Sequence, residues 1–595
     1  MEYTPTTILK TVDEGLKKRK SNVYAGVKRN GQWIETSVDD FMKQVKLLAL
    51  GLHQLGVKKG DKVSIHAENS TEWLIVDLAV LSLGAALVPI YTTQPGDQIK
   101  YILENSEAVV HFVSNDEVFA ETKPLIKSID TVKAVVSILG SKHQKLRTFE
   151  DLKQNGATLD QEKPGLYEEL KNQVQPDDIA TLIYTSGTTG VPKGVVLTHD
   201  NIAGNARASF EIFPFKPDEI DDPKILSYLP LAHMFERTAS YIYAFGGVPV
   251  YYIEDIEQIR EDFQTIKPVY FVTVPRLLEK IVTGIKVKGQ ELSGLKKRLY
   301  YWAVNLAENY DPENPPPSLK YKLADKVVYS KIRELFGGRL IGVNVGGAAL
   351  SPNIARFVNG IGVYCGLGYG LTETSPVLTG PPVGELRIGS SGKALPCVQI
   401  KIAEDGEILA KGPNIMKGYY KMPEKTQEVF NEDGWFCTGD IGHLDEDGWL
   451  FVTDRKKSLF KLSTGKYVAP QPIENALVNS GFIEQAVVVG SEHKFCGALI
   501  VPNWDNMKKR FETSGHEFPT ENITENEFVL KRIQKEVDKV NEDRSKWEKI
   551  KRFTLLKDQF TIDKGEITPT LKVKRNVINK NYKEIIDSMY ADEVT

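Results

Sequence analysis

The stretch Tyr184-Thr185-Ser186-Gly187-Thr188-Thr189-Gly190-Val191-Pro192-Lys193-Gly194 lies between two short apolar runs. It contains three glycines, four serine or threonine hydroxyls and one lysine. Glycines let backbone N–H groups approach an anion, hydroxyls donate to phosphate oxygens, and a lysine adds a positive charge. The stretch therefore predicts a polyphosphate-binding loop between two buried strands, 179–184 and 195–198.

Two other interpretations of this loop are less well supported by the sequence. A flexible linker has a similar composition, but linkers seldom lie between two strand-like apolar runs. The Walker A pattern GxxxxGK[ST] is not matched, and the loop is followed by a strand rather than a helix. We therefore expect a phosphate-binding loop of another kind.

The apolar spacing predicts helices and strands in alternation on both sides of the loop. Before the loop, we expect helices at 39–56 (capped by Asp39), 71–83 and 99–105, and strands at 62–66, 86–91 and 108–113. After it, we expect a helix at 202–212, strands at 225–229, 269–274 and 340–345, and mostly helical residues at 291–337, broken by a loop at 311–317. Such alternation indicates an α/β fold with doubly wound parallel sheets.

The pattern changes at about residue 384, where short strands with frequent Gly and Pro turns predict a small β-rich subdomain at about 384–453. A compact α+β unit follows, with a helix at 471–478, strands at 483–489 and 497–501, and a charged helix whose apolar face contains Leu530, Ile533, Val537 and Val540. The expected organisation is an N-terminal domain at 1–453, a hinge at 454–457 and a mobile C-terminal domain at 458–595.

The composition excludes several classes of protein. Lys+Arg of 75 against Asp+Glu of 79 gives a net charge of −4, too balanced to suggest nucleic acid binding. Four cysteines without CxxC spacing predict reduced thiols, and nine histidines without an HExxH or paired-ligand pattern argue against a zinc or iron site held by the protein. The N-terminus lacks a signal-peptide layout, and the most apolar stretch, 74–90, is too short to span a bilayer. We expect a cytoplasmic protein; peripheral membrane contact and a homodimer both stay open.

The loop at 184–194 resembles the signature loop of the AMP-forming, adenylate-making synthetases, which include acyl-CoA synthetases, peptide-synthetase adenylation domains and luciferases. The resemblance extends from about Leu52 to Arg575 and includes six motifs in the family order. It implies that ATP is bound by the loop residues Thr185, Ser186, Gly187, Thr188, Thr189, Gly190 and Lys193.

A second glycine-rich run, 366–374, contains an aromatic ring and a carboxylate. Tyr369 could stack on a purine, and Glu373 near phosphates needs a cation between them, for which Mg²⁺ is the usual choice. The run resembles the family's adenine-binding motif, with Gly368, Tyr369, Gly370 and Thr372 as nucleotide contacts and Thr185 with Glu373 as the magnesium pair. Gly347 and Ala348 resemble the segment along the nucleotide's other face.

Three further motifs follow in the family order. The run 435–440, which ends at Asp440, resembles a family motif whose aspartate accepts hydrogen bonds from the ribose hydroxyls. By itself, a Gly-Asp pair is more often part of a turn. The run 454–457 resembles the family's hinge motif. This resemblance implies that Arg455 contacts the ribose and that the backbone rotates at Lys457. In the segment 462–467, Gly465 would border the CoA pantetheine arm.

The run 565–575 resembles the family's last motif and places its catalytic lysine at Lys572, with Lys574 as the competitor for this register. A carboxylate that attacks the α-phosphate of ATP is an anion approaching a polyanion, and a lysine between them offsets the repulsion. A thiol must then reach the acyl-adenylate, so the lysine has to leave. The resemblance implies that the C-terminal domain rotates about the hinge between the two steps.

The stretch 226–237 looks like the form found in long-chain fatty acyl-CoA synthetases, and it implies that His233 lies where the acyl and CoA channels meet. Some relatives have an aromatic gate shortly after this histidine, whereas this chain has Glu236 and Arg237. We therefore expect a ligase that uses ATP, Mg²⁺, CoA and a long-chain fatty acid. The alternatives are a fatty acyl-AMP ligase that serves a carrier protein, a medium-chain or aryl acid CoA ligase, and a nucleotide-binding sensor without turnover.

Overall fold

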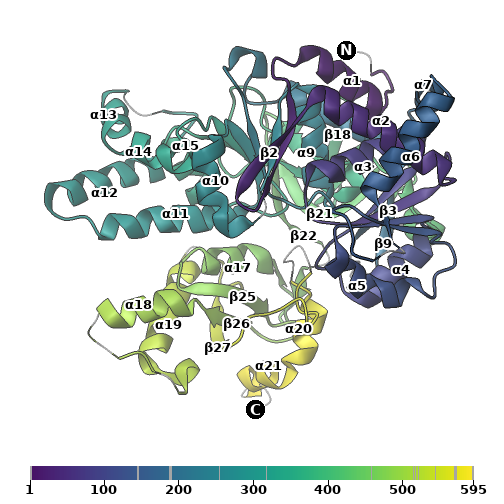
Figure 1. The fold of residues 1–595 in the computed structure, drawn as a ribbon. Coiled ribbons are helices and arrows are strands. Elements are labelled where there is room, and N and C mark those ends of the chain that lie inside the picture. The colour runs from purple at the N-terminus through teal and green to yellow at the C-terminus, as the bar shows by residue number, and fades with distance from the viewer. Residues whose placement is uncertain are drawn as a thin grey trace.

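The computed structural model describes residues 3–143, 146–185, 191–253, 255–315, 318–456, 458–513, 515, 517–519, 521–542, 544–568 and 573–591. Two large sheets with their helices and a smaller β-rich part make up the N-terminal region, and a separate C-terminal domain lies below it in Figure 1. The expected α/β class and the separate C-terminal domain are confirmed.

The first large sheet contains the predicted phosphate loop. Its strand order is β20-β9-β8-β4-β3-β5-β6-β7, and β8 and β9 form an antiparallel hairpin, whereas β4, β3, β5 and β6 are parallel neighbours. The strands are β3 (Lys62–His66), β4 (Ala86–Ile90), β5 (Val110–Val113), β6 (Ala134–Ser137), β7 (Arg147–Thr148), β8 (Ile179–Thr185), β9 (Lys193–Thr198) and β20 (Gly418–Tyr419).

The second large sheet has the order β14-β13-β12-β10-β11-β1-β2, and all its neighbours are parallel except β1 and β2. The strands are β1 (Val23–Arg29), β2 (Gln32–Ser37), β10 (Ile225–Ser227), β11 (Val250–Tyr252), β12 (Tyr270–Thr273), β13 (Gly342–Val345) and β14 (Tyr364–Leu367). Ligands of open parallel sheets bind beyond the carboxyl ends of the strands. The segments that begin at Tyr228, Val274, Gly346 and Gly368 all start at this edge.

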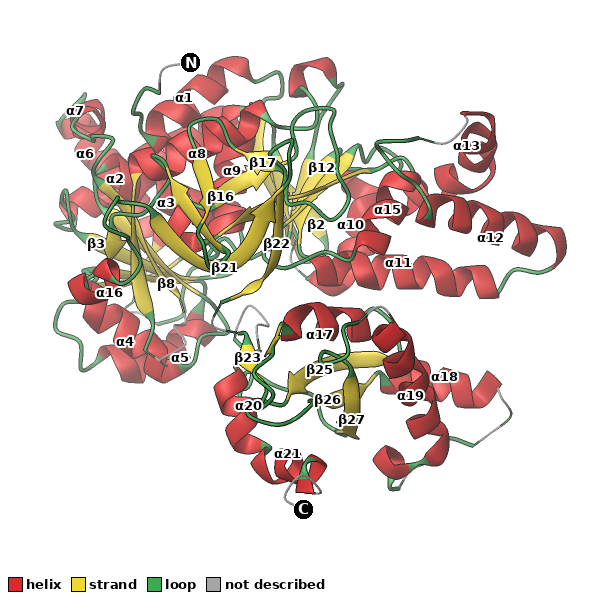
Figure 2. Ribbon diagram, turned by 180° about the vertical axis from the view of Figure 1, so that it is seen from behind, coloured by secondary structure: helices red, strands yellow, loops and turns green. Residues whose placement is uncertain are grey.

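Helices α3 and α9 belong to one hydrophobic core that also contains residues of both sheets (Figure 2). Every residue of α3 except Glu72 is buried, as expected for a helix that is apolar all round. Helices of this region are α1 (Ile8–Lys18), α2 (Val38–Gln54), α3 (Thr71–Ser82), α4 (Gly96–Ser106), α5 (Asp116–Ile126), α6 (Phe149–Glu162), α7 (Leu166–Asn172), α8 (His199–Glu211), α9 (Met234–Phe245), α10 (Ile259–Ile266) and α15 (Pro352–Gly360).

One predicted helix cap was wrong. Ser37, not Asp39, caps α2: its hydroxyl accepts a hydrogen bond from the backbone N–H of Asp40 at 3.1 Å. Asp39 lies within the first turn, where its negative charge is still favourable at the positive end of the helix dipole. Ser37 was missed because it also ends strand β2, so the helix begins directly after the strand.

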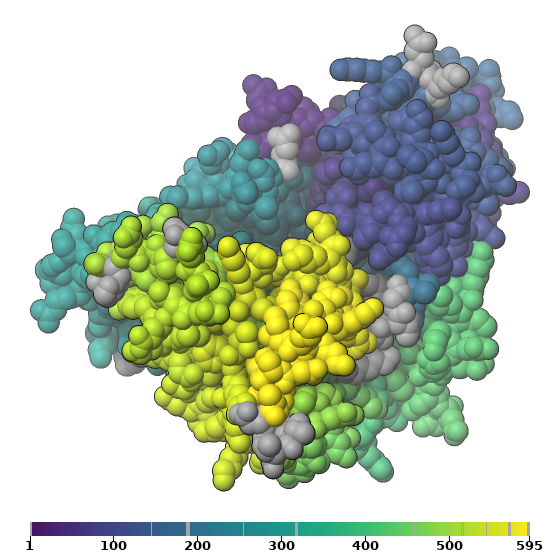
Figure 3. Space-filling model, turned by 90° about the horizontal axis from the view of Figure 1, so that it is seen from below, coloured from purple at the N-terminus to yellow at the C-terminus, as the bar shows by residue number. Residues whose placement is uncertain are grey.

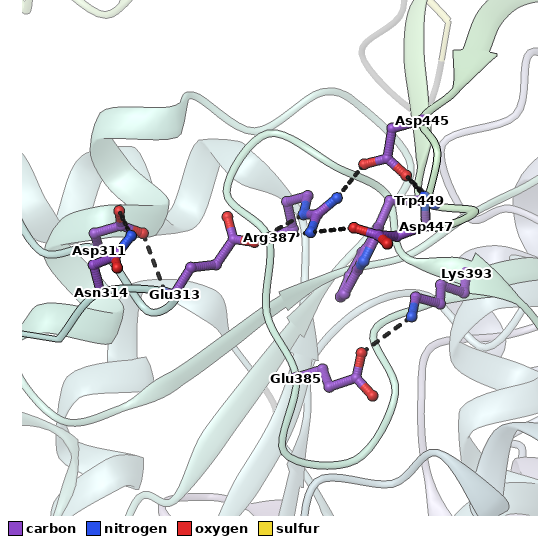
Figure 4. A network of polar contacts seen from close by, with 9 residues as sticks. All are labelled: Asp311, Glu313, Asn314, Glu385, Arg387, Lys393, Asp445, Asp447 and Trp449. Atoms are coloured by element: carbon purple, nitrogen blue, oxygen red, sulfur yellow. Dashed lines mark hydrogen bonds and ion pairs between the residues drawn. The ribbon is translucent and has the colours of Figure 1, made fainter.

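A long helical insertion projects from the second sheet (Figure 1). It contains α11 (Pro275–Gln290), α12 (Gly294–Glu308), α13 (Ser318–Ala324) and α14 (Ser330–Arg333), so it begins earlier than the expected residue 291. Figure 4 shows how its loop is attached: Arg387 forms ion pairs with Glu313 of the insertion and with Asp445 and Asp447 of a β-turn.

The β-rich part of the N-terminal region consists of two small antiparallel sheets and one short helix, α16 (Pro423–Gln427). The strands are β15 (Tyr369–Gly370), β16 (Val377–Gly380) and β17 (Lys393–Ala394) in one sheet, and β18 (Gln399–Ile402), β19 (Glu407–Lys411), β21 (Phe436–Leu444) and β22 (Leu450–Arg455) in the other.

The C-terminal domain has its own sheet, of order β25-β26-β27, and its own apolar clusters. Its elements are β23 (Phe460–Lys461), β24 (Tyr467–Val468), α17 (Pro470–Val478), β25 (Ile483–Val489), β26 (Cys496–Pro502), α18 (Trp504–Thr513), α19 (Glu527–Glu542), β27 (Ile550–Leu555), α20 (Arg575–Asn581) and α21 (Lys583–Met589). Seen from below, its residues, lime and yellow, lie in front of the teal insertion and beside the blue helices of the first sheet (Figure 3). Among the helices of the described residues, none combines the length and apolar character that a membrane span requires.

Candidate functional site

Strand pairing holds both ends of the predicted phosphate loop. Thr185 is the last residue of β8, Lys193 is the first residue of β9, and the two are partners across the antiparallel hairpin. Between them, the predicted ATP ligands Ser186, Gly187, Thr188, Thr189 and Gly190 lie outside the described residues. The described part of the site therefore begins at the two residues that anchor this loop.

A tyrosine connects Lys193 to Glu373. The Nζ atom of Lys193 lies 4.8 Å from the centre of the Tyr419 ring, and the Tyr419 hydroxyl donates a hydrogen bond to Glu373 Oε1 at 2.9 Å. Burial, and then the Glu373 carboxylate, raise the pKa of Tyr419. The hydroxyl therefore stays protonated and remains a donor, so the loop anchor and the predicted magnesium carboxylate are joined through one side chain.

Sequence reasoning missed Tyr419. It lies in β20, a strand of two residues that pairs with β9, so that Gly418 lies opposite Val196 and Tyr419 opposite Val195. A two-residue strand has no detectable periodicity. The available signal was the aromatic pair Tyr419-Tyr420 after a glycine, and its partner strand lies more than 200 residues earlier in the chain.

Glu373 and Thr185, the residues predicted to hold Mg²⁺, both offer the oxygen ligands that this ion takes. Glu373 is half-buried at the centre of a 3-10 helix, Thr372–Thr374, and Thr185 is half-buried at the end of β8. No group of three or more His, Cys, Asp or Glu side chains within the described ranges could hold a metal ion. One carboxylate and one hydroxyl leave most of the octahedral shell to phosphate oxygens and water, which suits Mg²⁺ bound together with a nucleotide.

Tyr369, Asp440 and Arg455 come together although they lie far apart in the sequence. Asp440 and Arg455 are partners in the pairing of β21 with β22. The Tyr369 hydroxyl donates to Asp440 Oδ2 at 2.8 Å, and Arg455 Nε donates to Asp440 Oδ1 at 3.0 Å. Burial, and then Asp440, raise the pKa of Tyr369 well above its usual value. Each carboxylate oxygen can accept more than one hydrogen bond, so Asp440 can also receive ribose hydroxyls.

The remaining nucleotide-contact candidates line the ends of two parallel strands. Gly347 and Ala348 are exposed beyond β13, and Gly347 has φ of +79°, which favours glycine. Gly368 follows β14, and Thr372 lies half-buried shortly after it. At Gly370, a Cβ atom would lie 1.8 Å from the carbonyl oxygen of Pro376, so no other residue fits that backbone.

His233 is the N-cap residue of α9. Its Nδ1 atom accepts a hydrogen bond from the backbone N–H of Phe235 at 3.1 Å, and its ring centre lies 6.5 Å from that of Tyr91. The side chain is half-buried and lies just beyond the carboxyl end of β10. Since Nδ1 is an acceptor, a neutral ring carries its proton on Nε2.

The two residues found in place of an aromatic gate are both in the core. Glu236 and Arg237 are 0% exposed. Arg237 pairs with Asp77 at 2.5 Å and donates to Thr181 Oγ1 at 2.7 Å, whereas Glu236 Oε1 accepts from the Ser227 hydroxyl at 2.6 Å. Neither side chain therefore borders an open channel.

The predicted catalytic lysine, Lys572, and the hinge residue, Lys457, lie outside the described residues. A β-bridge between Ile567 and Val573 closes the base of the segment that contains Lys572. The competitor Lys574 occupies the N-cap position of α20, and its backbone N–H donates to the carbonyl of Glu566 at 2.8 Å. Gly465 has φ of +84° in the tight turn between β23 and β24.

Asp454 lies at the junction between the N-terminal region and the C-terminal domain. It precedes the ribose candidate Arg455, is buried, and has one carboxylate oxygen, Oδ2, that forms no hydrogen bond with any described residue. Burial raises the pKa of Asp454 to about 6. The positive charge of Arg575 lowers this pKa, and the negative charge of Glu474 raises it further. Arg575 forms an ion pair with Glu474 at 2.5 Å. The base of the predicted lysine segment is thus adjacent to the residues that hold Asp440.

Two comparisons describe what the sequence is similar to. The sequence profile of the AMP-binding enzyme family matches residues 16–420, and that of the AMP-binding enzyme C-terminal domain matches residues 457–594. A long-chain-fatty-acid–CoA ligase of Mycobacterium bovis is 35% identical, covering 95% of this chain and 94% of its own. Long chain acyl-CoA synthetase 7, peroxisomal, of Arabidopsis thaliana is 32% identical, covering 94% and 82%.

Solved structures agree on the fold. The adenylation domain of a carboxylic acid reductase from Segniliparus rugosus, solved with AMP and a co-purified carboxylic acid, has a TM-score of 0.74. It covers 98% of this chain and 94% of its own at 21% identity. At this identity the likeness concerns the fold alone.

Proposed function

The chain belongs to the family of AMP-binding enzymes, and from that premise we propose that it is a long-chain fatty acid–CoA ligase. It converts ATP, a fatty acid and CoA into acyl-CoA, AMP and diphosphate through an acyl-adenylate. The long-chain enzymes among its relatives, which match nearly the whole chain, support this choice of substrate.

The proposal rests mainly on one observation: two groups of side-chain contacts, one suited to a ribose and one to phosphates, lie next to each other. Asp440, bound by Tyr369 and Arg455, forms a first group that can accept hydrogen bonds from ribose hydroxyls, and Lys193, Tyr419 and Glu373 form a second group suited to phosphates and their cation. Tyr369 of the first group lies in β15, and Glu373 of the second group lies four residues later in the 3-10 helix Thr372–Thr374. The two groups are therefore neighbours in the chain, which suits the two ends of a bound ATP.

In the first step, a carboxylate oxygen of the fatty acid attacks the α-phosphorus, and the bond to diphosphate breaks. Glu373 and Thr185 would hold Mg²⁺, which would supply neutralisation of phosphate charge. Lys193 and the loop donors reduce the remaining negative charge, and we assign to Lys572 the role of the cation between the attacking carboxylate and the α-phosphate. Because both reactants are anionic, these cations supply most of the catalytic effect.

In the second step, the thiol sulfur of CoA attacks the carbonyl carbon, AMP leaves with the bonding electron pair, and the thiol proton passes to solvent. The attacking thiol needs the route that Lys572 occupies in the first step. The C-terminal domain therefore rotates about Lys457, which brings the turn at Gly465 toward the pantetheine arm.

The test is an assay for AMP and acyl-CoA with ATP, Mg²⁺ and palmitate, with and without CoA. AMP and palmitoyl-CoA that require both palmitate and CoA are the expected result. Acyl-adenylate that accumulates without any effect of CoA would favour the ligase that serves a carrier protein. ATP binding without AMP under any condition would leave only the sensor.

A panel of acids from acetate to oleate, with an aryl acid such as benzoate, tests the substrate class. We expect kcat/KM to rise with chain length, because each buried CH₂ contributes up to about 0.8 kcal/mol. A maximum at medium-chain or aryl acids would contradict the long-chain proposal while leaving the ligase reaction intact. Fractionation of the native cells tests the predicted cytoplasmic location and decides whether part of the protein is bound to a membrane surface.

A further inference from the structure

Large apolar side chains are exposed on the helical insertion, which begins at α11 and ends with α14. Leu319 is 80% exposed, Leu295 is 71% exposed and Leu323 is 52% exposed. Leu319 and Leu295 are the two most exposed large hydrophobic side chains among the described residues. Exposed apolar residues that are scattered singly need no explanation, whereas a group of them on one part of a fold marks an interaction surface.

The contacts of α13 show which of its sides points outward. Tyr321 lies at the middle of this helix, and its hydroxyl donates to the carbonyl of Leu306 in α12 at 2.8 Å. Ala324, one turn later on the same side, is 0% exposed. Since a helix advances by about 100° per residue, Leu319 and Leu323, two residues before and two residues after Tyr321, lie on the side opposite α12.

Positive charge surrounds these leucines. Lys320 and Lys322 precede and follow Tyr321 directly, so they project from the two flanks of α13, and both are exposed. Residues 318–331 contain four lysines and one aspartate, and residues 286–301, around the turn from α11 to α12, contain five Lys or Arg and one glutamate. Because the whole chain has a net charge of −4, this end of the insertion is a basic region of an acidic protein.

The basic and apolar residues lie at an outer end of the molecule. Figures 1 and 2 show from opposite directions that α13 and the turn between α11 and α12 lie on the side away from the first sheet. At its other end, the insertion begins with Pro275 of α11, shortly after strand β12. The insertion therefore connects an exposed outer surface with the carboxyl edge of the second sheet, where the candidate site lies.

We propose that this outer end docks on the surface of a bilayer that contains anionic lipids. The docking surface is formed by Leu319, Lys320, Lys322 and Leu323 of α13 with Leu295 of α12. The leucines enter the boundary between headgroups and acyl chains, and the lysines reach the lipid phosphates. A bilayer takes up side chains that project from two separate helices, whereas a protein partner needs a complementary pocket for each of them.

The purpose of this contact rests on the proposed function. A long-chain fatty acid has an alkyl chain that is driven out of water, so it partitions into membranes. An enzyme docked on the bilayer meets this substrate at a higher local concentration than an enzyme in solution. Docking itself does not depend on the chemical reaction, so the two can be tested separately.

The test measures binding of the full-length chain to vesicles by co-sedimentation, with phosphatidylcholine alone or mixed with phosphatidylglycerol. We expect the wild type to bind the anionic vesicles at least about tenfold more tightly than the neutral ones. The double variant Lys320→Gln with Lys322→Gln should lose most of this difference, since each lysine near an anionic surface contributes about fivefold. The double variant Leu319→Ser with Leu323→Ser should lower binding to the anionic vesicles about tenfold or more.

Matched controls carry the same changes elsewhere on the surface. Leu139→Ser, in the loop after β6, replaces a leucine that is 51% exposed, and Lys508→Gln with Lys509→Gln neutralises two exposed lysines of α18. Both controls should bind like the wild type. A wild type that binds neither kind of vesicle would overturn the inference, even if an acidic carrier protein bound the same residues. Wild-type binding by both insertion variants would also overturn it.

Activity separates this inference from the proposed function. With palmitate supplied in anionic vesicles, both insertion variants should form palmitoyl-CoA several-fold more slowly than the wild type. With palmitate supplied on albumin, the rates should be equal, because no docking is needed. A wild type that binds anionic vesicles but forms no palmitoyl-CoA from either source would remove the proposed function and leave the docking surface standing.

Discussion

Glu236 is a carboxyl group that the fold keeps neutral. Burial raises its pKa from 4.5 to about 8, and the hydrogen bond from Ser227 opposes this only in part. Its Oε2 atom has no hydrogen-bond partner among the described residues. Between these two pKa values the folded chain holds a proton that the unfolded chain has released. The free energy of unfolding therefore falls as pH rises from about 4.5 to about 8.

Replacing Glu236 by Gln removes this titration and keeps an acceptor for Ser227. We expect Glu236→Gln to be close to neutral at pH 5 and to raise the free energy of unfolding at pH 8, by about 1–3 kcal/mol. The measurement is thermal or urea unfolding of both proteins across this range. A stability difference that is the same at pH 5 and pH 8 would contradict the assignment of a neutral buried carboxyl.

Lys572 and Lys574 compete for one catalytic role. Lys572→Ala should lower the rate of adenylate formation by about 100-fold or more, since it removes the cation between two anions. Thioester formation from a supplied acyl-adenylate should be retained. Lys574→Ala is the matched control, and it should retain both half-reactions. Single-turnover assays of each half-reaction measure this, and an equal loss of both steps in Lys572→Ala would contradict the rotation of the C-terminal domain.

At the scale of elements, short strands and turns matter most for the site. Strand β20 has only two residues, yet it places Tyr419 between Lys193 and Glu373. The helices and long strands of the core were predictable because their apolar periodicity extends over many residues. Strand β20 and the cap at Ser37 were not, because pairing with a distant strand and the direct strand-to-helix junction decide them.

Tyr419→Phe tests the contribution of β20. The ring that faces Lys193 remains, but the hydrogen bond to Glu373 is lost. A hydrogen bond to a charged group contributes about 1.5–3 kcal/mol, so kcat/KM for ATP should fall about tenfold or more, and the Mg²⁺ concentration needed for half-maximal rate should change. The adjacent Tyr420→Phe is the control and should keep the wild-type values. Wild-type kinetics in Tyr419→Phe would show that Glu373 needs no support from this strand.

At the scale of the whole molecule, an ion pair among the described residues connects the helical insertion to the C-terminal domain. Arg276, in the first turn of α11, pairs with Glu484 of β25, which also accepts a hydrogen bond from Asn503 at 2.7 Å. The rotation that we propose for the C-terminal domain would move Glu484 relative to Arg276, so we expect it to break this pair. The pair therefore favours the domain arrangement described here over the rotated one.

Charge reversal tests this connection. Arg276→Glu places two like charges together and should change the ratio of the two half-reaction rates by about threefold to tenfold, a modest effect because both side chains are partly exposed. Glu484→Arg should act in the same way. The double variant Arg276→Glu with Glu484→Arg restores opposite charges and should return the ratio toward wild type. A double variant no better than the single ones would exclude a role for this pair in domain rotation.

The amino-acid sequence by itself determined the α/β class, the order of the main helices and strands, and the family, because periodicity and motifs are local properties of the chain. It also provided Asp440, Arg455, Tyr369 and Glu373 as candidates. Only the tertiary structure decided that Asp440 binds both Tyr369 and Arg455, that Tyr419 connects Lys193 to Glu373, and that Glu236 and Arg237 lie in the core. Contacts between residues far apart in the chain depend on how sheets and helices pack, and no local pattern encodes that packing.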